Sequence, residues 1–167
     1  MLCRKRLACY RGRMIIHFIC RGNAFRSIIA EAYLSSLELD NLNALSSGTA
    51  AAADKTRNLA HYKGTLELLA KHGIREFAKG DYGDQLTQSR LERADINVCM
   101  NQRVYAESLQ SVVFPALPHV WRVADIGEPG RIPSIDSERE LYREEAYHEL
   151  VENVDRLISD AFATSAV

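Results

Sequence analysis

Short apolar runs alternate with longer stretches of helical periodicity along this chain. The apolar runs predict four buried strands, over residues 14–19, 44–47, 96–100 and 119–123. The longer stretches predict helices over residues 27–39, 57–72, 87–93, 102–109 and 137–162. Strands that alternate with helices favour a parallel sheet with right-handed crossovers and helices on both faces. The pattern therefore predicts an α/β fold.

No repeat, low-complexity tract or interdomain linker interrupts this alternation, and 167 residues suffice for one buried core. We expect residues 14–167 to form a single domain. In open parallel sheets, ligands bind at the carboxyl ends of the strands. Cys20 and Asp125 both come just after such an end. The pattern thus directs attention to these two side chains.

Charged residues are unevenly distributed along the chain. Residues 1–13 carry five basic side chains and no acidic one, and we expect them to form a disordered basic extension. Since the whole chain has a formal charge of −1 and the extension contributes +5, the remaining residues carry −6. A domain with a formal charge of −6 would repel phosphate groups, which argues against nucleic acid as a partner.

The cysteines and the apolar runs indicate in which cellular compartment the protein is expected. Four cysteines without regular spacing are too few for a disulfide scaffold, which favours a reducing, cytoplasmic setting. The charged and apolar N-terminal stretch lacks a small-residue cleavage site, so we expect no secretory signal. No apolar run reaches membrane-spanning length, so no membrane partner is expected. Cys3, Cys9, His17 and Cys20 lack zinc-ligand spacing, and we predict neither a metal nor a cofactor.

The stretch "FICRGNAFRS" places Cys20 at the end of the first strand and Ser27 at the start of a helix. Helix N-termini leave backbone N–H groups without partners and carry a positive dipole. Gly22 and Asn23 tolerate the left-handed backbone that turns such groups inward, which would form an anion cradle. The predicted cradle residues are Arg21, Gly22, Asn23, Ala24 and Phe25.

Two side chains complete the predicted chemistry of this loop. Arg26 can grip two oxygens of a bound phosphate. The positive surroundings favour the thiolate form of Cys20, which would then be a nucleophile aimed at the phosphate, with the Ser27 hydroxyl beside it. The spacing alone leaves another interpretation open, in which Cys20 is a buried apolar residue, Arg26 is solvated and Ser27 is a plain N-cap.

"FICRGNAFRS" followed by "IAEAYL" resembles the phosphate loop and first helix of the low-molecular-weight protein tyrosine phosphatases. Further segments resemble this family in the same order: "LSSGT", "HGI", "ADINVCMNQRV" and "VWRVADI". The resemblance implies a three-layer sandwich with a four-stranded parallel sheet in the order 2-1-3-4. It also implies hydrolysis of a phosphotyrosine protein or a small phosphomonoester through a phosphocysteine intermediate.

The resemblance assigns roles to individual residues. It implies that Cys20 is the nucleophile, Arg26 the phosphate clamp and Asp125 the general acid. Asn23 would hold the loop through hydrogen bonds, one of them to Ser46, and Ser27 would stabilise the thiolate.

A second carboxyl group is also a candidate for the general acid. The family's proline after the acid is Ile126 here, and Glu128 precedes a proline three residues after Asp125. An aspartic acid near a thiolate and a phosphate dianion is favoured in its protonated form, which suits proton donation to the leaving group. We therefore favour Asp125 and keep Glu128 as the alternative.

The chain departs from the family pattern at several positions. Phe25 replaces the second loop cysteine and Ile28 replaces a proline. The aromatic residues that the family places around a phosphotyrosine ring are missing after Thr49 and Asp125, and Tyr82 is either a substitute wall or surface packing. Phosphotyrosine specificity is therefore not predicted.

Two other functions stay open from the sequence. The first is a catalytically idle module that binds phosphate in the same cradle. The replacement of the family's prolines by Ile28 and Ile126 supports this alternative. An arsenate reductase would need further cysteines to relay a disulfide, and beyond Cys20 the body of the chain holds only Cys99.

Overall fold

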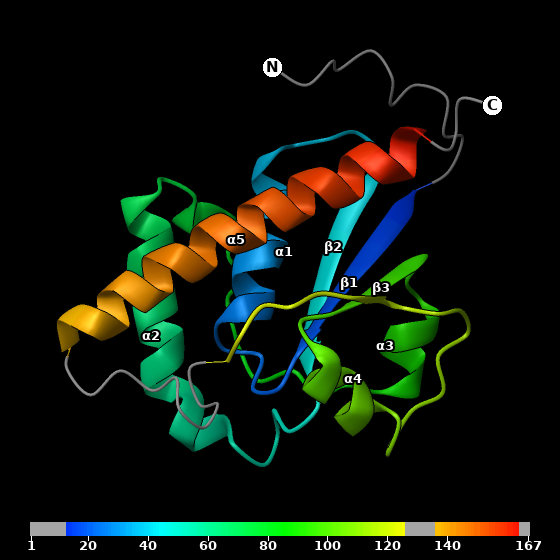
Figure 1. Ribbon diagram of the computed structural model, residues 1–167, viewed down its shortest axis with the longest axis horizontal. Coiled ribbons are helices and arrows are strands. Elements are labelled where there is room, and N and C mark those ends of the chain that lie inside the picture. Colours follow the sequence, from blue (N-terminus) through cyan, green and yellow to red (C-terminus); the bar gives the residue numbers. More distant parts are fainter. Residues whose placement is uncertain (1–12, 126–135, 164–167) are drawn as a thin grey trace.

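The computed structural model describes residues 13–125 and 136–163 (Figure 1). All of the predicted basic extension except Arg13 lies outside the described residues, and so does the rival acid Glu128. A helix long and apolar enough to cross a membrane does not occur in the described ranges.

The four described strands form one parallel sheet. They are β1 Met14–Cys20, β2 Leu42–Gly48, β3 Ile96–Cys99 and β4 His119–Val120. The strand order is β2-β1-β3-β4 and each neighbouring pair is parallel, which confirms the predicted fold. The fully buried residues of β1 include Phe18 and Ile19, because each side chain packs into the apolar cluster on its own face of the sheet.

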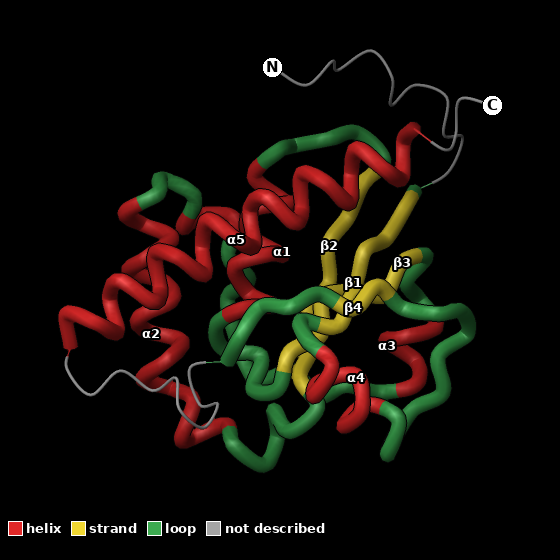
Figure 2. The backbone as a smooth tube through the Cα atoms, in the orientation of Figure 1, coloured by secondary structure: helices red, strands yellow, loops and turns green. Residues whose placement is uncertain are grey.

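Helices cover both faces of the sheet (Figures 1 and 2). They are α1 Arg26–Ser36, α2 Lys55–Lys71, the 3₁₀ helix η2 Arg75–Phe77, α3 Gln88–Glu92, α4 Gln102–Ser108 and α5 Asp136–Ala163. Side chains of α1, α2 and α5 share one apolar cluster, which includes Ile28, Leu69 and Leu150. Leu91 of α3 and Val104 of α4 belong to a second cluster, which accounts for the three layers.

The predicted boundaries hold to within a few residues, with two exceptions. The strand predicted over residues 119–123 ends at Val120, although the N–H groups of Trp121 and Val123 still donate to carbonyls of β3 and the residue after it. The 3₁₀ helix Arg75–Phe77 was not predicted, because a single short turn has no periodicity for a sequence to display.

The carboxyl ends of β1 and β2 are tied together closely. Cys20 pairs with Gly48 in the register, and the carbonyl of Cys20 accepts a hydrogen bond from the Thr49 N–H at 3.0 Å. A Cβ at position 48 would lie 2.5 Å from the Arg21 carbonyl oxygen, so only glycine permits this approach. The loop after β1 is therefore anchored at the edge of the sheet where ligands of this fold bind.

Candidate active site

The loop over residues 20–26 carries Cys20 at the carboxyl end of β1 and leads directly into α1. Its turn depends on Asn23, whose φ of 47° lies in the left-handed region. The Asn23 backbone N–H points inward and donates to Cys20 Sγ at 3.1 Å. Ser27 Oγ, in the first turn of α1, lies 3.0 Å from the same sulfur. Two polar groups of the loop region therefore converge on the thiol.

Ser27 is not the cap of α1. The helix begins at Arg26 with Phe25 in the N-cap position, and no side chain caps it. The Ser27 hydroxyl is fully buried and faces the loop instead of the helix backbone. The interpretation of Ser27 as a plain N-cap is therefore wrong.

Asn23 links the loop to its surroundings through its side chain. Its amide nitrogen donates to Ser27 Oγ at 3.0 Å and to Ser46 Oγ, on β2, at 2.9 Å. The carbonyl of the neighbouring Ala24 accepts a hydrogen bond from Thr65 Oγ1 of α2 at 2.6 Å. Strand β2 and helix α2 thus hold the loop from different elements.

Arg26 is buried, with 3% of its side chain exposed, so it is not a solvated helix residue. Its guanidinium donates through Nη1 to the Val123 carbonyl at 2.9 Å, and Nη2 lies 2.9 Å from Asp125 Oδ2. An arginine with two fixed contacts cannot swing away from the loop. The same contacts bring Asp125, far away in the sequence, to the thiol's side of the sheet.

A cavity of about 110 Å³ opens over this loop. Its lining consists of Cys20, Arg21, Gly22, Ala24, Phe25, Arg26, Asp54, Arg57, Asn58, His61 and Asp125. The structure thus brings the proposed nucleophile, clamp and acid into one cavity. Asn23, Ser27 and Ser46 do not line it and are all buried.

One wall of the cavity comes from the start of α2 and was not predicted. Asp54, Arg57, Asn58 and His61 lie on one helical face, a spacing that a solvated face would share. Asp54 forms an ion pair with Arg21, whose Nη1 lies 2.7 Å from Asp54 Oδ2. Among the described residues, the buried Nδ2 of Asn58 has no hydrogen-bond partner. Burial and the nearby Arg143 lower the pKa of His61.

Tyr82 does not line the cavity. It stacks on Tyr62 with ring centroids 4.6 Å apart, and its hydroxyl donates to the Lys55 carbonyl at 3.1 Å. Within residues 13–125 and 136–163, Phe25 is the one aromatic residue in the lining apart from the imidazole of His61, and its ring centroid lies 6.3 Å from that of Tyr142. Most of the described lining side chains are therefore polar or charged.

Cys99 lies on the other face of the sheet from Cys20. Cys20 belongs to the cluster shared with α1, whereas Cys99 is fully buried in the cluster shared with α3 and α4. Burial raises the pKa of the Cys99 thiol to about 12, with a smaller opposing effect of Ser108. This thiol is neither placed nor ionised to react with Cys20.

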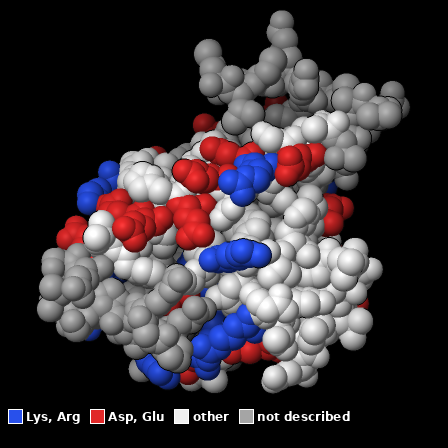
Figure 3. Space-filling view, viewed as in Figure 1, with Lys and Arg blue, Asp and Glu red and all other residues white. Residues whose placement is uncertain are grey.

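The charge around the cavity contrasts with that of α5. Figure 3 shows acidic side chains along α5, while basic side chains gather below it, toward the carboxyl edge of the sheet. Arg21 and Arg57 add positive charge to the cavity lining. No group of three or more His, Cys, Asp or Glu side chains suited to a metal ion occurs within residues 13–125 and 136–163.

A family model described as low molecular weight phosphotyrosine protein phosphatase matches residues 15–158. No curated protein sequence matches the chain.

Several solved structures share the fold. YfkJ from Bacillus subtilis is 22% identical, with a TM-score of 0.64 and coverage of 90% of this chain and 96% of that one. YwlE arginine phosphatase from Geobacillus stearothermophilus is 20% identical, with a TM-score of 0.57 and coverage of 90% and 94%. A low molecular weight protein tyrosine phosphatase from T. tengcongensis is 20% identical, with a TM-score of 0.58 and coverage of 88% and 99%.

Proposed function

This chain belongs to the low molecular weight phosphotyrosine protein phosphatase family, and from that premise we propose that it hydrolyses phosphomonoesters through a phosphocysteine on Cys20. One observation carries the proposal. The sulfur of Cys20 lies within 3.1 Å of the Asn23 N–H and 3.0 Å of the Ser27 hydroxyl, in the cavity that Arg26 and Asp125 also line. These are the groups that a thiolate nucleophile and an anionic transition state require.

The proposed reaction has two steps. In the first, the Cys20 thiolate attacks phosphorus, the bond to the ester oxygen breaks, and Asp125 gives its proton to that oxygen. In the second, Asp125 takes a proton from water, the water oxygen attacks phosphorus, and the thiolate leaves with inorganic phosphate as product. Loop N–H groups and Arg26 hold the phosphoryl oxygens throughout, because the transition state is loose and anionic.

A trapped intermediate tests this proposal directly. We expect the purified protein to release p-nitrophenol from p-nitrophenyl phosphate, and acid quenching during turnover to leave a phosphate adduct on the peptide that carries Cys20. Turnover with the adduct on another residue, or with none, would overturn the mechanism.

The alternatives have less support. An idle binding module would bind phosphate without turnover and would need no carboxyl group in the cavity, so the presence of Asp125 beside Arg26 supports the hydrolytic alternative. An arsenate reductase would need a second thiol to take over the bond at Cys20, and Cys99 faces the opposite side of the sheet. A reducing, cytoplasmic setting suits the phosphatase, since its nucleophile is a free thiol.

We further propose that the substrate is defined by its phosphate more than by an aromatic ring. YwlE is an arginine phosphatase and the T. tengcongensis protein is a protein tyrosine phosphatase, so the shared fold accommodates different leaving groups. Here the wall from α2 presents Asp54, Arg57, Asn58 and His61. The unpartnered Nδ2 of Asn58 offers a donor to an oxygen of the substrate.

The polar wall predicts weak discrimination between phosphotyrosine and alkyl phosphates. Each aromatic contact to a bound ring is worth about 0.5–1.5 kcal/mol, so the loss of two removes roughly tenfold to a hundredfold of preference. We expect kcat/KM for phosphotyrosine to exceed that for an alkyl phosphate of similar size by less than about tenfold. The comparison uses matched peptides and is repeated with His61→Trp, which should raise the preference. A strong preference in the wild type would contradict the prediction.

The general acid has a distinct kinetic signature. Asp125→Asn should lower kcat for alkyl phosphates by about a hundredfold or more, because an alkoxide leaves poorly without a proton. For p-nitrophenyl phosphate the loss should stay below about tenfold, since that leaving group departs nearly unaided. The two substrates are compared for Asp125→Asn and for Glu128→Gln. If Glu128→Gln alone shows the leaving-group dependence, Asp125 is not the acid.

A further inference from the structure

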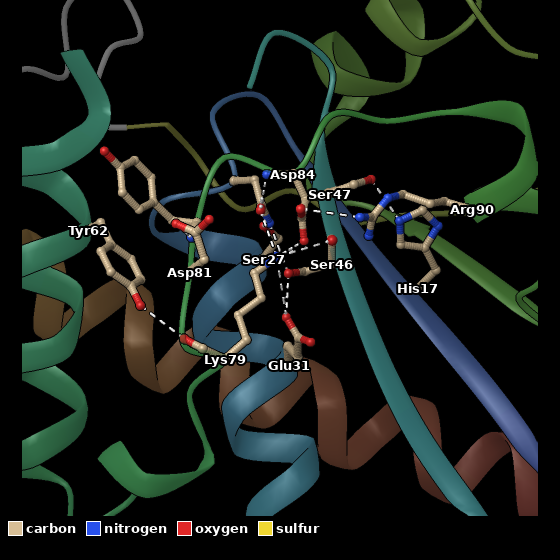
Figure 4. Close-up of polar contacts among 12 residues, drawn as sticks. His17, Ser27, Glu31, Ser46, Ser47, Tyr62, Lys79, Asp81, Asp84 and Arg90 are labelled. Carbon is tan, nitrogen blue, oxygen red and sulfur yellow. Dashed lines mark hydrogen bonds and ion pairs between the residues drawn. The ribbon is translucent and has the colours of Figure 1, made fainter. Parts of the chain in front are cut away.

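Lys79 lies behind the phosphate loop and belongs to none of the sequence features that indicated the site. It comes from the segment between η2 and α3, and 19% of its side chain is exposed. Its ammonium lies 2.8 Å from Asn23 Oδ1, 2.8 Å from Asp84 Oδ2 and 3.4 Å from the Ser46 carbonyl. In Figure 4 the Lys79 side chain reaches into the space where Ser27, Glu31 and Ser46 converge.

Lys79 and the Asp84 N–H together fix which way the Asn23 amide faces. An ammonium group can only donate hydrogen bonds, so the Asn23 atom beside it must be the carbonyl oxygen. The Asp84 N–H donates to the same oxygen at 2.9 Å. The amide nitrogen of Asn23 must then face the other side, where it donates to Ser27 and Ser46.

The amide orientation in turn decides where the Ser27 proton points. Ser27 Oγ accepts the hydrogen bond from Asn23 Nδ2 at 3.0 Å, so its own hydrogen is left for another acceptor. The sulfur of Cys20 lies 3.0 Å away, and a thiolate can only accept. Ser27 is thus oriented as a donor to the nucleophile.

We infer that Lys79 is a positioning residue, which acts through Asn23 and Ser27 to stabilise the Cys20 thiolate. The inference rests on the proposed function in one respect, namely that Cys20 is the nucleophile. Lys79 also keeps a positive charge beside this chain of hydrogen bonds. That charge polarises the Asn23 amide and strengthens the donation that follows from it.

Other charged groups surround both ends of the series of hydrogen bonds from Lys79 to Cys20. Lys79 faces Glu31 of α1, whose carboxylate is 3.9 Å away, and burial raises the pKa of Glu31 against the opposing effect of Lys79. Asp84 is shared with Arg90 of α3 at 3.2 Å. Buried His17 of β1 lies in the same region, and its pKa is lowered to about 4 by burial, with Lys79 among the smaller causes. At the other end, Cys20 shares its cavity with Arg21, Arg26, His61 and Asp125.

The test measures the thiol without relying on turnover. The rate of iodoacetamide reaction at Cys20 is followed against pH by mass spectrometry of the peptide that carries it. In Lys79→Met the pH midpoint of this reaction should rise by about one unit, because the thiolate loses its oriented donor. At pH values below both midpoints, kcat/KM for p-nitrophenyl phosphate should fall by about tenfold with it.

Two control variants separate this effect from a loss of fold. Lys55→Met removes an exposed ion pair to Asp81 beside the same segment, at 3.2 Å, and should leave the midpoint unchanged. Lys79→Met combined with Glu31→Gln removes the buried carboxylate that would lose its cation. This double variant should regain thermal stability yet keep the raised midpoint. If the midpoint returns to the wild-type value together with stability, the role of Lys79 is structural only.

A third comparison tests whether Lys79 acts on Cys20 through Ser27. In a Ser27→Ala background, Lys79→Met should shift the midpoint no further, because the proposed route passes through the Ser27 hydroxyl. An undiminished shift in that background, or no shift in Lys79→Met, would overturn the inference. A wild-type protein without phosphatase turnover that still shows the Lys79 shift would refute the proposed function alone.

Discussion

Cys20→Ser should lower kcat for p-nitrophenyl phosphate by about a thousandfold or more. The serine hydroxyl is a far weaker nucleophile at neutral pH and a poorer leaving group in the second step. Phosphate binding should be kept or tightened, because the substitution removes the repulsion between a thiolate and an anion while the loop N–H groups and Arg26 remain. Steady-state kinetics and competitive inhibition by inorganic phosphate measure the two effects separately.

The matched control is Cys99→Ala, which removes the buried thiol on the other face of the sheet. It should retain wild-type kcat at a temperature where both proteins are folded. Near-normal hydrolysis by Cys20→Ser would exclude a phosphocysteine mechanism, and a loss confined to Cys99→Ala would place the reactive thiol elsewhere.

Arg26→Lys should lower kcat/KM by about a hundredfold to a thousandfold. An ammonium group is a point charge, so it cannot keep the contacts to Val123 and Asp125 and also offer two parallel donors to a phosphate. Inhibition by inorganic phosphate should weaken in the same variant, which distinguishes a lost clamp from a lost nucleophile.

Arg103→Lys serves as the control for Arg26→Lys. Arg103 is half exposed on α4, where its guanidinium lies 3.1 Å from Glu107, and the proposed reaction does not use it. This variant should keep kcat/KM within about twofold, because exposed ion pairs contribute little. Full activity in Arg26→Lys would show that the phosphate binds outside the 20–26 loop.

The sequence predicted the parallel sheet because short, mainly apolar segments such as β1 alternate with longer segments of helical spacing. It was less informative at β4, where only His119 and Val120 are assigned to the strand and both are exposed. A strand of two exposed residues is defined by hydrogen bonds to its neighbour and not by its own composition. The start of α1 was placed one residue late for a related reason, because Ser27 has the chemistry of a cap but uses its hydroxyl elsewhere.

The loop of the candidate site was accessible from the sequence because its residues are contiguous. The wall from α2 was not, since Asp54, Arg57 and His61 have the spacing of an ordinary solvated helix face. Lys79 gave no signal either. Its significance lies in a 2.8 Å contact with Asn23 across 56 positions of the chain, and such a pairing depends on tertiary structure alone.

The proposed phosphate clamp depends on segments that are translated at different times. Arg26 is anchored by the Val123 carbonyl, 97 positions later, and the adjacent Ala124 carbonyl accepts a hydrogen bond from the Tyr142 hydroxyl of α5. At a synthesis rate of about 5–20 residues per second, those positions take roughly 5–20 seconds to translate. During that interval the nascent chain holds Cys20 without the contacts that fix Arg26 and Asp125. If the proposed mechanism holds, the site should therefore be complete only after α5 has left the ribosome.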